Sequence, residues 1–420
     1  MVIEKPQLFS ERREFLLFIF LMLSLILARL FFSYHTYQAF ITKPFYYTTA
    51  KVLNAYPKRK NGKTYTVLKL QSEEGLTFFT TSYRDKNMRN KVLRLQLYPS
   101  DRITFWEYLG YFYIKSRIKQ SEEIPENTKG MLLKGVVSQH SDSALSSFYQ
   151  GIFFATPLLP ELREKIAALG VSHLVALSGF HLGILWSVVY GVLLLLYRPL
   201  QQRYFPYRYS LLDIGVVTLL LLGFYVWFVG APPSLLRSYA MMLVGWVVIL
   251  LGIELLSFTF LTTVALVLLL LFPVLIVSLS FWLSVMGVFY IFLLLRYAKE
   301  VNGWIISLLF IPLGIFLLML PIVHGIFGMT TAYQLLSPLL SLLFILFYPL
   351  VILLHLLGMG GLLDGGLVWL FSLPSEGAEK LLPIWATLLY MGLSLWAIWS
   401  RKAFWLLLAV AMGYGGYLFL

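Results

Sequence analysis

Long uncharged apolar segments fill the second half of the chain. The stretch 258–281, for example, contains no Lys, Arg, Asp or Glu. A helix needs roughly 20 predominantly apolar residues to cross a bilayer. Nine segments beyond residue 173 approach that length: 174–197, 211–230, 239–256, 258–276, 278–296, 304–322, 332–356, 382–400 and 403–420. The pattern predicts a polytopic α-helical membrane protein.

The first apolar run, residues 15–32, lies close to the N-terminus. Lys5, Arg12 and Arg13 precede it, and no small-x-small cleavage site follows it. We interpret this run as a signal anchor with a cytoplasmic N-terminus, because basic flanks stay on the cytoplasmic side. A cleaved signal peptide is the alternative. With residues 1–34 as membrane anchor, about ten spanning helices are expected.

Residues 45–113 follow a different pattern, in which short strand-like segments alternate with polar turns. The strand-like segments are 64–71, 76–83 and 91–98, and Asn61-Gly62 is a strong hairpin signal. Such strands predict a small barrel or an open sheet, with the OB-fold a natural candidate. We therefore assign residues 35–125 to an inserted, soluble, all-β domain that is OB-like.

The segment 126–173 joins this domain to the apolar half. It contains a polar linker and an amphipathic entry helix at 160–168, where Pro160 suits the first turn. Residues 174–420 then form the transmembrane domain. Within it, 361–373 is expected to lie in the membrane plane or to re-enter, so the span count stays open.

Positive charges set the expected topology. Three arginines crowd the connection 198–208, and Arg296 with Lys299 marks another. The positive-inside rule places both connections in the cytoplasm. Arg401 and Lys402 do not fit this alternation, which leaves the topology of the C-terminal part open.

Composition adds a strong charge asymmetry to this picture. The chain is 59% hydrophobic and 13% charged, against about 25% charged residues in ordinary soluble domains. Its net charge is nevertheless +13, and residues 51–120 hold fifteen Lys and Arg against five Asp and Glu. The excess indicates an anionic partner for the β domain. The chain has no cysteine, which excludes disulfides, thiolate metal sites and Cys nucleophiles.

The β domain interleaves its cations with twelve aromatic residues between positions 51 and 120. Cations that meet phosphates, together with rings on which bases stack, bind single strands without reading their sequence. In the alternative, the rings fill a small core and the cations face anionic lipid headgroups. The candidate DNA-binding residues are Lys58, Arg59, Lys60, Lys63, Arg84, Lys86, Arg89, Lys91 and Arg94.

Two polar interruptions break the apolar half. The first is 170–183 (GVSHLVALSGFHLG), and the second is 230–238 (GAPPSLLRS), whose paired prolines stop a helix. Polar groups at such breaks either bond to neighbouring helices or line a water-filled path. Arg237 lies about one turn into the following span, where it either reaches lipid headgroups or attracts phosphates.

The sequence contains few signs of a catalytic site or a metal site. Ser178 and His181 are three residues apart and share a helix face. This spacing suggests the hypothesis of a serine hydrolase in which His181 is the base for Ser178. No orienting acid or oxyanion donor is evident, so we expect no catalytic residue and no enzyme. The six histidines form no HxH or HExxH pattern. His324 and His355 are interpreted as structural partners, and no metal site and no cofactor are expected.

The segment 172–183 (SHLVALSGFHLG) resembles the SHLLAISGLHVG signature of the ComEC competence proteins, the channels of bacterial natural transformation. Similar blocks follow in the family's order: PPSLLRSYAMM at 232–242, SLSFWLSVMGVFYI at 278–291 and PIVHGIFGMTTAYQLLSPLL at 321–340. The motif positions carried over are Ser172, His173, Ser178, Gly179, His181, Gly183, Pro233, Ser234 and Arg237. The stretch 151–159 departs from the family's GD-containing pattern, and Ser238 replaces its usual Ala.

The resemblance implies an inner-membrane channel that moves single-stranded DNA into the cytoplasm, with the β domain facing the periplasm. It implies membrane lipids, a periplasmic DNA-binding competence protein, a separate nuclease and a cytoplasmic motor as partners. This chain shows neither the HxHxDH motif of the nuclease-like domain in long members nor a nucleotide-binding motif. A small-molecule or lipid transporter with an accessory anion-binding domain is the alternative. The sequence leaves the oligomeric state undetermined.

Overall fold

The computed structural model describes residues 8–9, 11–60, 63–83, 88, 91–123, 128–250, 257–298 and 302–419. The chain divides into two compact units. The β unit comprises Phe9–Asn127 and Thr262–Trp282, and the helical unit consists chiefly of Thr128–Leu261 and Leu283–Leu420. The chain therefore enters the helical unit, returns to the β unit for one short segment, and ends in the helical unit.

One helix, α1 (Arg12–Ile41), covers the predicted anchor. A capping box fixes its start, since the Glu14 side chain accepts the backbone N–H of Glu11. Large apolar side chains along the helix are exposed, such as Phe20 at 73% and Phe31 at 68%. This exposure is what a helix surrounded by lipid requires.

Six strands form one sheet in the order β5-β3-β2-β1-β4-β6. The strands are β1 (Tyr46–Lys60), β2 (Lys63–Ser72), β3 (Thr77–Ser82), β4 (Lys91–Tyr98), β5 (Phe112–Tyr113) and β6 (Lys115–Glu123), with the helix α2 (Phe105–Leu109) before β5. The three predicted strands correspond to β2, β3 and β4. The predicted hairpin is confirmed by the pairing of Lys60 with Lys63, although Asn61 and Gly62 themselves lie outside the described residues.

The two edge strands of the sheet lie close to each other because they are consecutive in the chain. Only Ile114 separates β5 from β6, yet β5 pairs with β3 in parallel and β6 pairs with β4 in antiparallel orientation. The Ile114 N–H donates to the Phe79 carbonyl over 2.9 Å, and the Thr80 and Ser116 hydroxyls lie 2.7 Å apart. Alternate side chains fill the interior, among them Leu68, Leu70, Phe78, Leu93, Leu95, Leu97 and Phe112.

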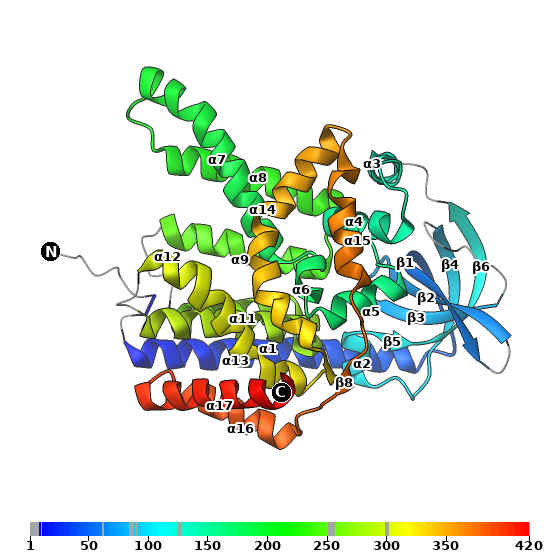
Figure 1. Ribbon diagram of the computed structural model, residues 1–420. Helices are drawn as coiled ribbons and strands as arrows, with labels where there is room; N and C mark the ends of the chain where they lie inside the picture. Colours follow the sequence, from blue (N-terminus) through cyan, green and yellow to red (C-terminus); the bar gives the residue numbers. More distant parts are fainter. Residues whose placement is uncertain are drawn as a thin grey trace. The chain divides into compact units, whose positions relative to one another are not determined.

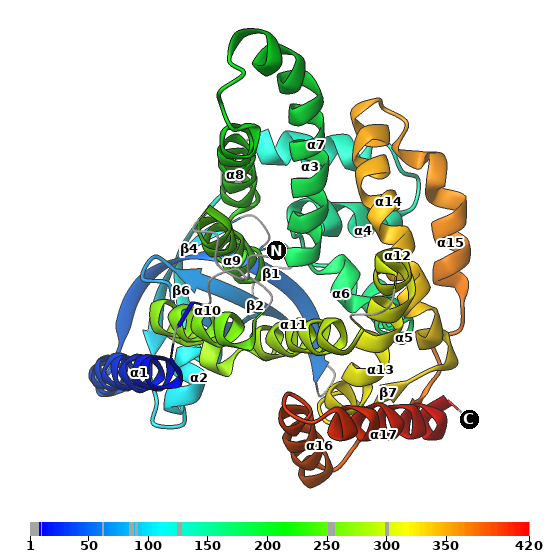
Figure 2. The same ribbon diagram turned by 90° about the vertical axis from the view of Figure 1, so that its left-hand side faces the viewer.

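The helical unit is built from long helices joined by short connections (Figures 1 and 2). The long helices are α7 (Gly179–Tyr204), α8 (Ser210–Val229), α9 (Pro233–Leu250), α11 (Leu279–Tyr297), α13 (Ile311–His324), α14 (Ser337–Leu356), α16 (Ile384–Trp396) and α17 (Arg401–Phe419). In Figure 1, α7 and α8 run side by side, and Figure 2 shows α16 next to α17.

Shorter elements connect these helices. They are α3 (Thr128–Val137), α4 (Ser143–Phe154), α5 (Pro160–Ala168), α6 (Ser172–Val175), α12 (Gly303–Ile305), η2 (Ile306–Phe310), η3 (Ala332–Leu336), η4 (Gly360–Leu363), α15 (Asp364–Ser372) and the strand pair β7 (Met329–Thr330) and β8 (Ala378–Glu379). Between α9 and α11 the chain forms α10 (Phe258–Leu271) and η1 (Pro273–Val277), and most of this segment belongs to the β unit.

Seven of the described helical segments are long and apolar enough to cross a membrane. They are Arg12–Ile41, Gly179–Tyr204, Ser210–Val229, Leu279–Tyr297, Gly303–His324, Ala332–Leu356 and Arg401–Phe419; three shorter apolar helices accompany them. The fold is thus mostly helical with a small β sheet, and its long apolar helices are typical of a polytopic membrane protein. The expected number of about ten spans is not confirmed, because only seven segments in the described part reach the length.

The segment predicted to lie in the membrane plane or to re-enter contains the short helix α15. Its nine residues cover about 14 Å at a rise of 1.5 Å each, less than half of a hydrocarbon core of about 30 Å. Helix α15 is therefore too short to span a bilayer.

Candidate functional site

Two breaks separate the entry helix α5 from the long helix α7. The chain turns at Gly170, whose φ of +68° lies in the left-handed region that favours glycine. A Cβ at this position would also lie 3.2 Å from the side chain of Gln334. Four residues form α6, and the chain then breaks again before α7 begins. The predicted span 174–197 therefore starts later than expected, because its first residues are not one continuous helix.

Ser178 and His181 together cap the N-terminus of α7. The Ser178 hydroxyl caps the backbone N–H of His181 and lies 3.4 Å from Nδ1 of His181, which also accepts the backbone N–H of Ser178 over 3.3 Å. Nδ1 is thus the acceptor of this ring, and Nε2 carries its proton. The ring is fully buried, with Phe344 and Tyr348 at centroid distances of 5.1 and 4.9 Å. Among the described residues no carboxylate bonds to His181, so this part of the chain lacks the orienting acid of a serine hydrolase.

The second interruption meets the first. Gly230 and Ala231 both have positive φ values, of +101° and +47°, and α9 begins two residues later. The Ser234 hydroxyl donates to the carbonyl oxygen of Leu177 over 2.8 Å. A Cβ on Gly179 would lie 3.2 Å from the Ser238 hydroxyl. The N-termini of α7 and α9 are therefore in contact, as the sequence pattern alone could not establish.

A third polar segment, at the start of α14, joins these two. The Thr331 hydroxyl donates to the carbonyl oxygen of Ala168 over 2.5 Å, and the Ser337 hydroxyl donates to that of Gly170 over 3.1 Å. Nε2 of His173 lies 3.2 Å from the Ser341 hydroxyl. The segment 168–183 is thus held on one side by α9 and on another by η3 and α14.

The motif residues differ in exposure. His181 and Arg237 are buried, Ser172, His173 and Gly179 are exposed, and Ser178, Gly183 and Ser234 are half-buried. Arg237 is only 5% exposed, so the interpretation that it reaches lipid headgroups is wrong. Pro233 begins α9, and its side chain lies outside the described residues.

The cations proposed to bind DNA fall into separate places on the β unit. Lys58 and Arg59 are exposed near the β1–β2 hairpin, where they pair with Tyr65 and Thr64. Lys60 and Lys63 flank the same turn, and their side chains lie outside the described residues, as do Arg84, Lys86 and Arg89 altogether. On β4, Nζ of Lys91 lies 3.9 Å from a Glu123 carboxylate oxygen.

Arg94 has acidic neighbours as well. It lines a small depression with Glu73, Glu122 and three uncharged residues. The surface of β4 is therefore mixed in charge, whereas the described tip of the β1–β2 hairpin presents the exposed cations Lys58 and Arg59.

A row of aromatic rings lies on the outward face of β2, β3 and β5, with two of the rings just beyond the ends of β3 and β5. We call it the aromatic platform: Tyr65, Phe79, Tyr83, Tyr111 and Tyr113. Tyr83 is 74% exposed, and Tyr111 and Tyr113 are 50% and 53% exposed. Nζ of Lys69 lies 4.1 Å from the centroid of the Tyr111 ring, a cation–π distance. Burial lowers the pKa of Lys69. Other rings of this unit, such as Phe78 and Phe112, fill its core, so the aromatic residues are divided between the core and the surface.

Comparison with known proteins identifies the family. The model of the Competence protein family matches residues 156–419. The chain belongs to the Competence protein family. The match confirms the resemblance to the ComEC proteins that the signature at 172–183 indicated. Comparisons with curated proteins and with solved structures give no significant match.

The competence-family region contains the whole contact between the three polar segments. α6, the first turns of α7 and α9, and the η3–α14 junction all lie within 156–419. The strands of the sheet precede this region. The aromatic platform and the hairpin cations are therefore features of this chain that the family match does not cover.

Sequence reasoning missed the residues that hold the signature segment from the side of α14. Gln334 and Ser337 are buried polar residues in the predicted span 332–356, and the buried Thr331 directly precedes it. Their polarity inside an apolar run was the available signal, since polar groups in a membrane must bond to a partner. Which partner they bond to depends on how the chain folds.

Proposed function

We propose that this competence-family protein is an inner-membrane channel that passes single-stranded DNA into the cytoplasm during natural transformation. The observation that carries the proposal is the meeting of the three polar interruptions within the family region, at 168–183, 230–238 and 331–341. Family membership supports a role in DNA uptake, and the meeting of the interruptions supports the site.

Electrostatics supports this assignment. A single strand carries about one charge per nucleotide, and an unpaired charge costs tens of kcal/mol in hydrocarbon by the simplest estimate, so the strand needs a hydrated route. Irregular backbone at membrane depth is tolerated where it is buried in protein or lines such a route. Helix N-termini carry partial positive charge, and the N-termini of α7 and α9 meet beside the buried Arg237. The two helix N-termini and the Arg237 cation together favour the binding of phosphate groups.

We propose further that the β unit is an OB-fold that receives the strand on the periplasmic side. The support is the pairing of β1 with β2 and β4, of β2 with β3, and of β3 with β5 in parallel. OB-folds bind oligonucleotides on the face of strands 2 and 3 and on the loop between strands 1 and 2. Here that face is the aromatic platform, and that loop follows Lys58 and Arg59. An experimental structure without the β3–β5 pair would refute the assignment.

The channel proposal also requires partners. A channel that binds no nucleotide needs an external source of directionality, for which we propose a cytoplasmic motor. A separate nuclease and a periplasmic DNA-binding competence protein complete the proposed pathway, and membrane lipids surround the helices.

The test uses a naturally transformable strain without the gene, complemented with the wild type or with Arg237→Glu. Periplasmic and internalised labelled DNA are measured separately, with membrane levels of the protein as control. We expect the deletion and the variant to accumulate periplasmic DNA and to lose internalised DNA, because a buried anion would repel phosphates. Normal internalisation in the deletion strain would refute the channel, and a defect in small-molecule or lipid transport alone would favour a transporter.

A further inference from the structure

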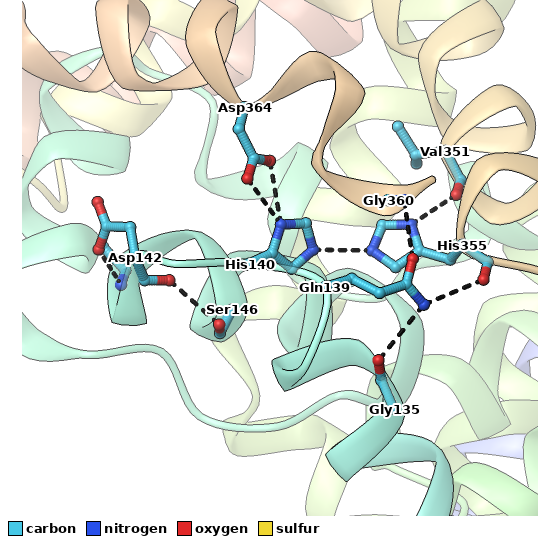
Figure 3. Close-up of polar contacts among 10 residues, drawn as sticks. Gly135, Gln139, His140, Asp142, Ser146, Val351, His355, Gly360 and Asp364 are labelled. Atoms are coloured by element: carbon cyan, nitrogen blue, oxygen red, sulfur yellow. Dashed lines mark hydrogen bonds and ion pairs between the residues drawn. The ribbon is translucent and has the colours of Figure 1, made fainter. Parts of the chain in front are cut away.

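A polar cluster lies at the end of α14, apart from the family signature (Figure 3). It consists of His140 in the α3–α4 connection, His355 in the last turn of α14, and Asp364 at the start of α15. His140 is separated from His355 by 215 positions and from Asp364 by 224 positions. The His140 ring is fully buried, and the Asp364 side chain is 20% exposed.

The hydrogen bonds fix where the His355 ring carries its hydrogen. Nδ1 of His355 lies 2.7 Å from the carbonyl oxygen of Val351. A carbonyl oxygen only accepts, so Nδ1 of His355 must donate. In a neutral His355 ring, Nε2 therefore carries no hydrogen and presents a lone pair.

The same argument applies to His140. Its Nδ1 lies 2.9 and 3.0 Å from the two carboxylate oxygens of Asp364. An ionised carboxylate only accepts, so Nδ1 of His140 donates as well. A neutral His140 next to an ionised Asp364 would then also present a lone pair at Nε2.

The two Nε2 atoms face each other at 2.9 Å. This is the length of an N–H···N hydrogen bond, and two lone pairs at this distance would repel each other. One additional proton is therefore needed between the rings. If Asp364 is protonated instead and donates to Nδ1 of His140, the hydrogen of His140 moves to Nε2, and the cluster again holds one additional proton.

Charge and distance both favour a proton as the bound cation. One proton balances the single negative charge of Asp364, so the buried cluster is neutral, and burial penalises any net charge. Two histidine nitrogens on one tetrahedral metal, with bonds of roughly 2.0–2.1 Å, would lie about 3.3 Å apart. The observed 2.9 Å is shorter than that separation.

The elements packed around the pair contribute few other titratable groups in the described part of the chain. The Tyr149 ring of α4 stacks on His140 with centroids 4.4 Å apart and lies 4.6 Å from the His355 ring. Asp142 caps α4 through the Ala144 N–H and is turned away from the pair (Figure 3). Lys134 lies in the last turn of α3.

The cluster joins two parts of the helical unit. Next to His140, the Gln139 side chain donates to the His355 carbonyl oxygen over 3.1 Å and accepts the Gly360 N–H over 2.7 Å. A Cβ on Gly360 would lie 2.6 Å from Oε1 of Gln139 and 2.8 Å from Nε2 of His355. The absence of a side chain at Gly360 therefore lets the α14–α15 turn close onto the α3–α4 connection.

We propose that His140, His355 and Asp364 form a binding site for one proton, and that this proton locks the α3–α4 connection onto the end of α14. Loss of the proton leaves two facing lone pairs beside an unbalanced carboxylate. Gain of a second proton leaves two facing N–H groups. Both changes weaken the lock, so it closes over an intermediate pH range and opens on either side.

Helix α14 connects the lock to the family signature. Tyr348 and Phe344, two and three turns before His355, enclose the His181 ring. The proton site therefore lies on the same helix as the residues that pack against the cap of α7. This placement makes the site a candidate for pH control of the competence-family region.

Hydrogen exchange of the full-length protein in lipid nanodiscs tests the proposal, since the Gly360 amide donates across the lock. Exchange of peptides that cover 356–364 is measured from about pH 5 to about pH 9, around the ordinary histidine range, and corrected for the intrinsic rate. We expect protection to be greatest near neutrality and to fall about tenfold at either end, as the loss of one charged hydrogen bond implies. Peptides from 384–396 provide the internal control.

Asp364→Asn separates proton binding from ordinary hydrogen bonding. The introduced amide can donate to Nδ1 of His140, which places a hydrogen on Nε2 without an additional proton. The alkaline loss of protection should therefore disappear in this variant, whereas His35→Gln, a change of an exposed histidine in α1, should leave the profile unchanged. A flat wild-type profile, or an unchanged alkaline loss in Asp364→Asn, would overturn the proposal; the wild-type profile decides alone if the variant does not fold.

Discussion

At the scale of single residues, Ser178 of the family signature has a structural role as the N-cap of α7. The Ser178 hydroxyl accepts a backbone N–H at the start of α7, and its partner His181 is buried against two aromatic rings. Asparagine caps helices as well as serine does, whereas alanine costs about 1 kcal/mol. The identity of the side chain at this position can therefore separate capping from nucleophilic catalysis.

We expect Ser178→Asn to retain DNA uptake and Ser178→Ala to lower the free energy of unfolding by about 1 kcal/mol while retaining activity. A nucleophile would be lost in both variants. Thermal unfolding in detergent and internalised DNA in cells are the two measurements. Ser187→Ala, a change on the same helix at a hydroxyl that bonds to the Gly183 carbonyl, is the matched control. Loss of uptake in Ser178→Asn at normal protein levels would contradict a purely structural role.

At the scale of elements, alternation along the strands divides the aromatic residues of the β unit between its core and its surface. Side chains of a strand point alternately to opposite faces. Phe78 and Thr80 therefore point inward on β3, while Phe79 and Thr81 point outward. Because β2 and β5 flank β3, outward residues from the three strands assemble one aromatic surface.

We expect Tyr83→Ala with Tyr113→Ala to weaken oligonucleotide binding by tenfold or more, since stacking contributes roughly 1–3 kcal/mol per base. Fluorescence anisotropy of labelled oligothymidylate with the full-length protein in detergent measures the affinity. Lys58→Gln and Arg59→Gln should instead lower the salt dependence of binding, by about 0.7 in the logarithmic slope for each phosphate that the protein no longer neutralises.

Tyr47→Ala is the control for the platform. Tyr47 is 59% exposed but pairs with Gln96 on the β1–β4 side of the sheet. An equal loss of affinity in this control would show that binding does not depend on the platform. Binding to anionic vesicles without binding to oligonucleotides would favour lipid as the anionic partner.

At the scale of the whole molecule, the chain combines apolar helices suited to a membrane with a β unit whose exposed surface carries cations. Seven of the described helical segments can cross a bilayer, whereas the β unit closes its own core and carries exposed cations. The basic connection at 198–208 is expected in the cytoplasm by the positive-inside rule. The proposed channel requires the β unit on the opposite side of the membrane.

Labelling of single cysteines tests this topology, because the natural chain has none. In intact spheroplasts a membrane-impermeant maleimide should label T64C, at an exposed position of β2, and should label R203C only after permeabilisation. L339C, at a position 54% exposed on α14, should stay unlabelled under both conditions if lipid covers it. The reverse labelling of T64C and R203C would place the β unit in the cytoplasm.

Periodicity in the sequence predicted most elements, because burial in lipid or in a small core imposes a local pattern. The apolar runs predicted α7, α8, α11, α13, α14 and α17, and alternation predicted β2, β3 and β4. Strand β1 was missed since a bulge between Val52 and Asn54 shifts its alternation and Pro57 argues against a strand. The number of about ten spans stays a prediction, because seven of the described segments reach the length and three further apolar helices are shorter.

The sequence by itself determined the membrane class, the basic β insert, the two broken segments and the family signature, since each depends on residues close together in the chain. Only the tertiary structure decided which segments meet. Ser234 reaches Leu177, Thr331 reaches Ala168, and His140 reaches His355 across separations of 57, 163 and 215 positions. Hydrogen bonds and charge balance between such distant residues depend on which elements pack together, and the periodicity of a single sequence shows that a face is buried but not which element covers it.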